Sequence, residues 1–165
     1  MAKTALTVNL HIEGARETLR ALSALPKDAS KELRDASLEL SKNLAVKVKA
    51  SGMADSAPQS AHVASTVRAE RDRVPVISAG GNKKLGRNRA PAWALLFGSI
   101  FGMSSRSGWY AGPHYAGSSG LQYHRRHRGT AAYWFFPVVE EEQAAISAAW
   151  NRAADNVVRD FSEGG

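Results

Sequence analysis

The C-terminal part of the chain constrains the fold most, because it predicts one long amphipathic helix. Pro137 stands at the first turn, where a residue without an N–H is tolerated. Three glutamates follow, at the end of the helix where its dipole favours negative charge. Apolar and long side chains then recur at helical spacing, which predicts a stripe that packs on the rest of the chain. The stripe consists of Val139, Gln143, Ile146, Trp150, Ala153, Val157 and Phe161.

The N-terminal part predicts a short strand and two helices. Leu6, Val8 and Leu10 alternate with other residues, which is typical of a strand, and this strand should end near Ile12. A first helix is expected over residues 14–24, before Pro26.

A second, longer helix follows, with Asp28 or Ser30 as its N-cap. Gly52 and Pro58 are expected to mark its end. The spacing of its apolar residues predicts a single buried stripe. The stripe consists of Leu33, Ala36, Leu40, Leu44 and Val48.

The middle of the chain predicts a hairpin and then long connections. Residues 63–70 and 74–80 have the composition of strands, and residues 71–73 can form the loop between them. Pro75 cannot donate a ladder hydrogen bond, so we expect the second strand at a sheet edge. Residues 82–92 predict a basic loop, and the apolar residues 93–103 fit either a strand or a short helix.

These elements predict an α+β fold in a single domain over residues 1–165. We expect a small, mostly antiparallel sheet packed by two N-terminal helices and a long C-terminal helix. Residues 100–130 are expected to form a long loop or arm, because the segment is rich in Gly, Ser and aromatic residues. Residues 162–165 are expected to be a frayed tail.

Charge is distributed unevenly along the chain. The net charge is +7, yet residues 73–139 contain nine basic residues and no acidic one. Residues 140–165 contain two basic and six acidic residues, a balance of −4. A basic block of this kind predicts an acidic partner, which can be nucleic acid, a membrane surface or an acidic protein face.

The residue types exclude several classes of protein. There is no cysteine, so disulfides and thiolate metal sites are excluded. The N-terminus does not resemble a signal peptide, and no apolar run approaches the roughly 20 residues that span a bilayer. We therefore expect a soluble protein that is made and used in the cytoplasm and does not enter a membrane.

Enzymatic chemistry is not indicated either. His124 and His127 are three residues apart, but two arginines lie between them and no third ligand is near, which disfavours a divalent metal ion. The basic segment has no carboxylate, and no known nucleophile or phosphate-binding motif is present. We expect no catalytic residue, no cofactor and no metal ion.

The basic and aromatic residues of the middle segment fit two kinds of partner. Cations can neutralise phosphates while aromatic rings stack on bases. Alternatively, the same residues can form an interface with another protein subunit. No recognition-helix pattern or RNA-binding aromatic signature is visible, so the protein interface is favoured. The candidate subunit or DNA interface consists of Lys83, Lys84, Arg87, Arg89, Trp93, Phe97, Arg125, Arg126, Arg128, Tyr133 and Trp134.

Three stretches of the chain resemble a known family. They are "ADSAPQSAHVASTVRAE" at 54–70, "APAWALLFGS" at 90–99 and "YWFFPVVEEEQAAISAAW" at 133–150. Together, over roughly residues 10–162, they resemble the neck or tail-completion proteins of long-tailed bacteriophages, which include head-to-tail connector and minor tail proteins. The chain departs from the family pattern in three places. Residues 59–62 replace its usual Thr-Gly, Leu96 replaces its usual Glu before Phe-Gly, and the segment 100–130 is longer and more basic than the family pattern predicts.

The resemblance implies a structural, non-enzymatic virion protein. It implies a six- or twelve-fold ring of copies around the DNA channel at the head–tail junction, assembled in the host cytoplasm. The implied neighbours are head-closure or connector proteins and tail-terminator or tail-tube proteins, with nonspecific contact to packaged DNA. The alternatives are a sequence-nonspecific nucleic-acid-binding protein and, as a third hypothesis, a small toxin or nuclease that uses His114, His124 and Arg125.

Overall fold

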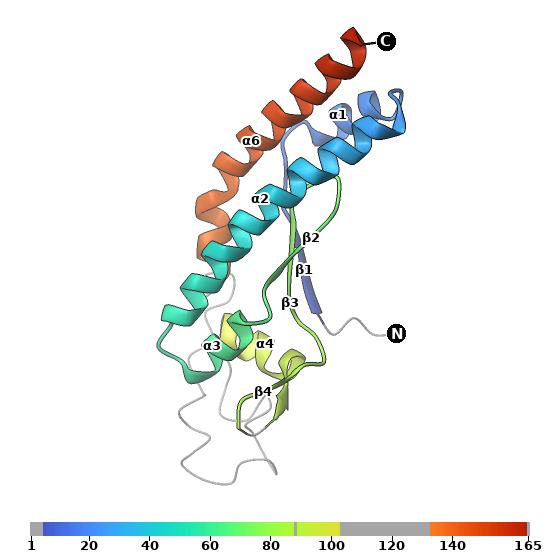
Figure 1. Ribbon diagram of the computed structural model, residues 1–165. Helices are drawn as coiled ribbons and strands as arrows, with labels where there is room; N and C mark the ends of the chain where they lie inside the picture. Colours follow the sequence, from blue (N-terminus) through green and yellow to red (C-terminus); the bar gives the residue numbers. More distant parts are fainter. Residues whose placement is uncertain (1–4, 88, 103–132, 165) are drawn as a thin grey trace.

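The computed structural model describes residues 5–87, 89–102 and 133–164 and shows a mixed α+β fold, as predicted (Figure 1). Of the loop expected at residues 100–130, residues 100 and 101 belong to a helix, and residues 103–130 lie outside the described ranges. The elements in chain order are β1 (Ala5–Asn9), α1 (Ala15–Leu22), α2 (Lys27–Ala54), α3 (Pro58–Ala64), β2 (Arg68–Glu70), β3 (Val76–Gly80), β4 (Lys84–Leu85), β5 (Ala90–Pro91), α4 (Ala92–Phe101) and α6 (Phe136–Glu163).

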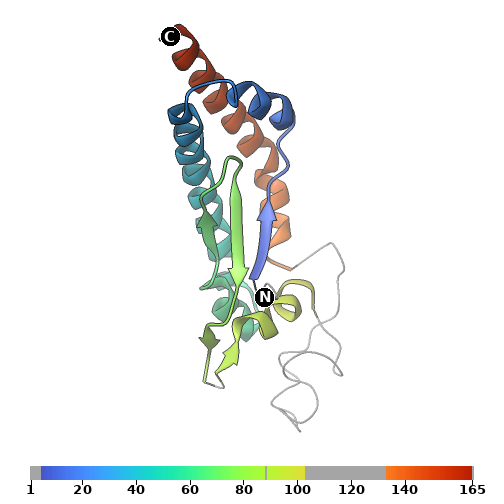
Figure 2. The same cartoon turned by 90° about the vertical axis from the view of Figure 1, so that its right-hand side faces the viewer.

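The two long helices α2 and α6 lie side by side and cover one face of the sheet (Figures 1 and 2). The predicted stripe of α6 is largely confirmed, since Val139, Ile146, Trp150 and Val157 are buried. Ala154, rather than the predicted Ala153, is the buried alanine of the stripe. The helix continues to residue 163, so the fraying expected at residues 162 and 163 is not observed.

The buried face of α2 is partly polar, which the apolar pattern did not indicate. Ser37 and Ser41 are fully buried, whereas the predicted Ala36 and Leu40 are only partly buried. The Ser41 hydroxyl accepts a hydrogen bond from the N–H of Val76 at 2.9 Å. The two serines therefore fix the start of β3 against the helix. Pro26 occupies the N-cap position without a side-chain cap, so the prediction of a cap at residue 28 or 30 is wrong.

Gly52 does not end α2 but lies inside it, at a close contact. A Cβ atom on Gly52 would lie 2.5 Å from the Cβ of Ala64 and 2.7 Å from the Trp134 ring. Only a glycine lets α3 and the indole ring approach the helix this closely. Pro58 begins α3, which extends to Ala64, so the strand predicted from residue 63 is shorter than expected and begins at residue 68.

The main sheet has three antiparallel strands in the order β1-β3-β2. The hairpin predicted through residues 71–73 is confirmed, since β2 pairs with β3. However, β3 is the central strand, so its predicted place at the edge is wrong. Pro75 lies just before the strand, where no N–H is needed, and its carbonyl accepts the N–H of Leu10 at 3.0 Å. Leu6 and Val8 of β1 pair with Ala79 and Ile77 of β3.

Glu70 at the end of β2 predicts a pH-dependent contribution to stability. Its carboxylate accepts hydrogen bonds from the Ser78 hydroxyl at 2.7 Å and from Nε of Arg68 at 3.0 Å. These two bonds lower the pKa of the Glu70 carboxyl below its ordinary value of 4.5. Because the folded-state pKa is lowered, the stabilisation is complete above the unfolded-state pKa and is lost as pH falls through the folded-state pKa.

We expect Glu70→Gln to reduce the free energy of unfolding at pH 7 by less than about 1 kcal/mol, since the pair is partly exposed. The difference from wild type should shrink as pH falls below 4.5. Urea unfolding between pH 7 and pH 2 measures this. Ser78→Ala should reduce the pH-dependent part, because the hydrogen bond from the Ser78 hydroxyl is the largest cause of the lowered pKa of Glu70. A difference that grows toward acid pH would contradict the assignment.

The basic loop expected at residues 82–92 is a short hairpin joined to a helix. Strands β4 and β5 are antiparallel, with Leu85 opposite Ala90. Residues 92–101 form helix α4, which decides between the two structures that the sequence left open. The N–H of Ala92 donates to the carbonyl of Lys83 at 2.8 Å, so the start of α4 is held by the first arm of the hairpin.

The end of α4 also contacts the segment that leads into α6. The N–H of Tyr133 donates to the carbonyl of Ile100 at 2.9 Å. Phe101 stacks on Phe136, the first residue of α6, at a ring-centroid distance of 5.5 Å. The end of α4 and the start of α6, which flank residues 103–132 in the sequence, are therefore in contact with each other.

Candidate interaction surface

The strongest candidate site lies at the end of the molecule formed by β4, β5 and α4 (Figure 1). Its charged residues are all exposed, and none of them forms an ion pair within the described part of the chain. Two large aromatic side chains on α4 are also exposed, Trp93 by 48% and Phe97 by 60%. We call this site the hairpin–α4 surface, and it consists of Lys83, Lys84, Arg87, Arg89, Trp93 and Phe97.

The aromatic residues of this surface are attached rigidly to the core. Trp93 and Phe97 are one helical turn apart and therefore share one face of α4. Most of the remaining surface of the helix is buried, including the side chains of Leu95, Leu96 and Ile100. The ring of Phe97 stacks on that of the partly buried Phe101 at 6.2 Å. The ring of Phe97 is thus held by Phe101, and both exposed side chains project from a helix that is anchored in the core, which reduces the entropy lost on binding.

The loop of the hairpin holds Arg89 in a strained conformation. Its φ is 53°, in the left-handed region, and Gly86 in the same loop has φ 67°. Glycine adopts this region freely, but a residue with a Cβ is strained there by roughly 1–2 kcal/mol. The N–H of Arg89 donates to the carbonyl of Gly86 at 3.2 Å, which closes the loop. A strained arginine where glycine would fit better makes Arg89 a candidate functional residue.

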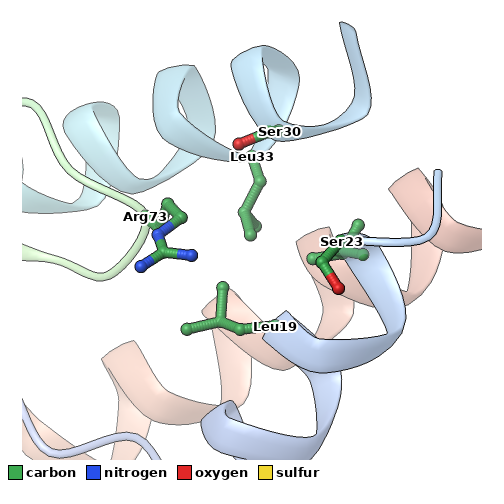
Figure 3. A pocket seen from close by; sticks show the side chains of 6 residues that line it. Leu19, Ser23, Ser30, Leu33 and Arg73 are labelled. Carbon is green, nitrogen blue, oxygen red and sulfur yellow. The ribbon is translucent and has the colours of Figure 1, made fainter. Parts of the chain in front are cut away.

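The basic segment of the sequence does not form one surface. Arg73 lies at the other end of the sheet, between α1 and α2, at a small pocket of about 40 Å³ (Figure 3). Leu19 and Leu33 line the same pocket. The carbonyl of Arg73 accepts hydrogen bonds from the indole N–H of Trp150 and from the Ser37 hydroxyl. Arg73 is therefore a structural part of the β2–β3 turn.

Trp134 is a correction to the predicted interface. It is only 2% exposed, and its indole N–H donates to the Ser99 hydroxyl at 3.0 Å. Phe135 next to it is buried as well. Both side chains can enter the core because residues 133–135 form an irregular turn before α6, whereas neighbours on a strand would point to opposite faces. Tyr133 is partly buried.

The remaining predicted residues lie outside the described ranges. These are the three arginines of the candidate interface and the histidines considered for a metal site or a nuclease. Their roles stay predictions. The residues concerned are Arg125, Arg126, Arg128, His114, His124 and His127.

A buried polar cluster, which the sequence patterns did not reveal, links α3, α4 and the start of α6. The Ser60 hydroxyl donates to the Asp55 carboxylate at 2.6 Å and lies 3.0 Å from the Ser99 hydroxyl. Ser99 in turn accepts the indole N–H of Trp134. Both serines are fully buried. The three stretches that carry the family resemblance meet at this cluster, because each of them contributes at least one of these residues.

The described ranges contain neither of two other kinds of site. In these ranges no three histidine, aspartate or glutamate side chains are grouped so that they could hold a metal ion. No helix there is long and apolar enough to cross a membrane. The hairpin–α4 surface is accordingly the site on which we base the functional argument.

Comparison of the chain with protein-family models, with curated proteins and with solved structures gives no match.

Proposed function

We propose that this chain is a structural, non-enzymatic virion protein of the head–tail junction of a long-tailed bacteriophage, where copies form a ring around the DNA channel. The observation that carries the proposal is the hairpin–α4 surface. Exposed aromatic side chains on a rigid helix, beside arginines that form no ion pair with another described residue, have the composition of protein interfaces. The proposed neighbours are further copies of the chain and the connector and tail proteins above and below the ring.

The charge of α6 supports the proposal. Its segment, residues 140–165, has a net charge of −4, and Glu140 and Glu141 are exposed. A ring subunit has to present two surfaces that fit each other, and opposite charge brings them together and fixes their register. The buried cluster at Ser60 and Ser99 adds support, since it joins the three family-like stretches into one structural element.

Cryo-electron microscopy of the phage that encodes this chain tests the proposal. We expect a ring at the head–tail junction with the hairpin–α4 surface at a subunit boundary. Trp93→Ala combined with Phe97→Ala should lower the yield of joined particles about tenfold or more, because exposed aromatic anchors commonly contribute over 1 kcal/mol each to an interface. Free heads and tails should accumulate, and negative-stain counting measures both.

Arg16→Ser, exposed on α1, serves as the control and should join heads to tails as the wild type does. A well-resolved neck without density for this chain would remove the virion role.

Sequence-nonspecific nucleic-acid binding is the second candidate function, because the same cations lie beside an exposed tryptophan that can stack on bases. If all four cations contact phosphates, the logarithm of duplex affinity should fall with the logarithm of salt concentration with a slope of about −3.6. Lys83→Ser with Lys84→Ser should then reduce that slope by about half. A weak, salt-independent affinity would exclude this function.

A further inference from the structure

The exposed large apolar side chains of the described residues form two pairs on different helices. One pair is Trp93 and Phe97 on α4. The other is Val46, 68% exposed, and Met53, 49% exposed, on α2. Val46 and Met53 are seven residues apart, which places them on one side of the helix, opposite the buried residue Val48 and its neighbours.

The two pairs lie in surroundings of different charge. A salt bridge of 2.8 Å between Lys47 and Glu142 places the start of α6 beside the part of α2 that carries Val46. Glu140 and Glu141, both exposed, are at this start of α6. We call the surface formed by Val46, Met53, Glu140 and Glu141 the α2–α6 face. Lys42 and Lys49 lie within about one turn of Val46 on the same side of α2, so the carboxylates that contrast with the cations of the hairpin–α4 surface are those of α6.

We propose that the hairpin–α4 surface of one copy of this chain binds the α2–α6 face of a second copy. The apolar pair on each surface would cover the apolar pair on the other surface. Lys83 and Lys84 of one copy would lie against the carboxylates at the start of α6 in the second copy. The match of apolar pair with apolar pair and of cations with carboxylates favours a second copy over another occupant. The inference rests on the proposed function in that it supplies the contact between ring subunits.

The contact is head-to-tail, because the two surfaces are different and lie on the same chain. A dimer formed in this way keeps one free surface of each kind, so further copies add until the ring closes. A two-fold dimer would instead bury the same patch on both copies and stop at two. This difference makes the inference testable with mixtures of variants.

The experiment uses the purified full-length chain and sedimentation velocity over a range of concentrations. One variant carries Trp93→Ser and Phe97→Ser, and the other carries Val46→Ser and Met53→Ser. The wild type should form assemblies larger than dimers, and each variant alone should be monomeric, with association at least about tenfold weaker. An equimolar mixture should form dimers and nothing larger, because only one productive pair of surfaces remains.

A charge exchange tests the polar part of the contact. Lys83→Glu with Lys84→Glu should weaken association about tenfold or more, since like charges would then face each other. Adding Glu140→Lys and Glu141→Lys to the same chain should restore it. All substituted side chains are exposed, so circular dichroism melts should match the wild type. Arg16→Ser is the control and should assemble normally.

Several results would overturn the inference. They are a wild type that stays monomeric, a mixture that stays monomeric, and a Val46→Ser, Met53→Ser variant that assembles like the wild type. Normal assembly of the Trp93→Ser, Phe97→Ser variant together with weakened binding of a duplex DNA probe would assign the surface to nucleic acid. If head-to-tail assembly occurs in solution and the phage neck lacks the chain, the proposed function fails while this inference stands. If the neck contains the chain but neighbouring copies join through other surfaces, the proposed function stands and this inference fails.

Discussion

Trp150→Ala is expected to lower the free energy of unfolding by about 3–5 kcal/mol, the largest effect of a single substitution that we predict. Trp150 is fully buried, and its indole N–H donates to the carbonyl of Arg73 at 2.8 Å and to the Ser37 hydroxyl at 3.1 Å. The substitution removes packing between α6, α2 and the β2–β3 turn, and it leaves buried polar groups with fewer partners. Urea unfolding followed by circular dichroism measures the change.

Two further variants separate packing from hydrogen bonding at this position. Trp150→Phe keeps much of the ring volume but removes the N–H donor, so we expect a smaller loss of about 1–3 kcal/mol. Ile146→Val, one turn earlier in the same buried stripe, should cost about 0.5–1.5 kcal/mol as an ordinary core truncation. A loss below 1 kcal/mol for Trp150→Ala would contradict the burial of the indole.

Gly52→Val is expected to lower the free energy of unfolding by about 3 kcal/mol, and Gly52→Ala by about 1–2 kcal/mol. Helix propensity alone predicts the opposite sign for alanine, a gain of about 1 kcal/mol. The close approach decides the sign, because a Cβ atom would lie 2.5 Å from the Cβ of Ala64 and 2.7 Å from the Trp134 ring. Both neighbours are buried, so neither can move away freely.

The exposed Ala50 of the same helix provides the matched control. Ala50→Gly should cost about 1 kcal/mol, the ordinary effect of a glycine in a helix. Trp134→Leu combined with Gly52→Ala should show a smaller combined loss than the sum of the two single variants, since the smaller side chain leaves room for the new methyl group. Stabilisation by Gly52→Ala would show that the indole does not pack against α2.

The sequence allowed prediction of the elements whose side chains repeat with a regular period. The stripe of α6 from Val139 to Val157 gave a long helix in the correct place, and the alternation of Leu6 and Val8 gave β1. The turn residues between β2 and β3 gave the hairpin. In each case one face of the element is buried along its whole length. This burial produces the regular spacing of apolar residues from which the element is predicted.

Features that depend on distant partners were not predictable in this way. Ser37 and Ser41 appear as polar residues in a helix, and only the neighbouring backbone of residues 73 and 76 makes them suitable for the core. Gly52 was interpreted as a helix end because its neighbours Ala64 and Trp134 are separated from it in sequence. Pro75 suggested an edge strand because the sequence does not show that the ladder begins one residue later.

The candidate site was predicted in part. The cations of the hairpin and the aromatic residues of α4 were expected at an interface, because charge without counter-charge is visible in the sequence. The prediction that Trp134 belongs to the interface was wrong, because residue identity alone does not distinguish a buried aromatic side chain from an exposed one. Val46 and Met53 were not identified, although they lie off the apolar stripe predicted for α2 and are therefore candidates for exposure.

The hydrogen bond between the N–H of Tyr133 and the carbonyl of Ile100 has a consequence for how this protein can diversify. It brings the two ends of residues 103–132 together without the help of that segment. In general, the entropic cost of joining two fixed residues through a flexible chain rises only with the logarithm of the chain's length, by about 0.6 kcal/mol for each doubling. Sequences of different length between Gly102 and Tyr133 are therefore compatible with the same register of α4 and α6. Relatives of this chain can differ in length there and keep the same arrangement of helices.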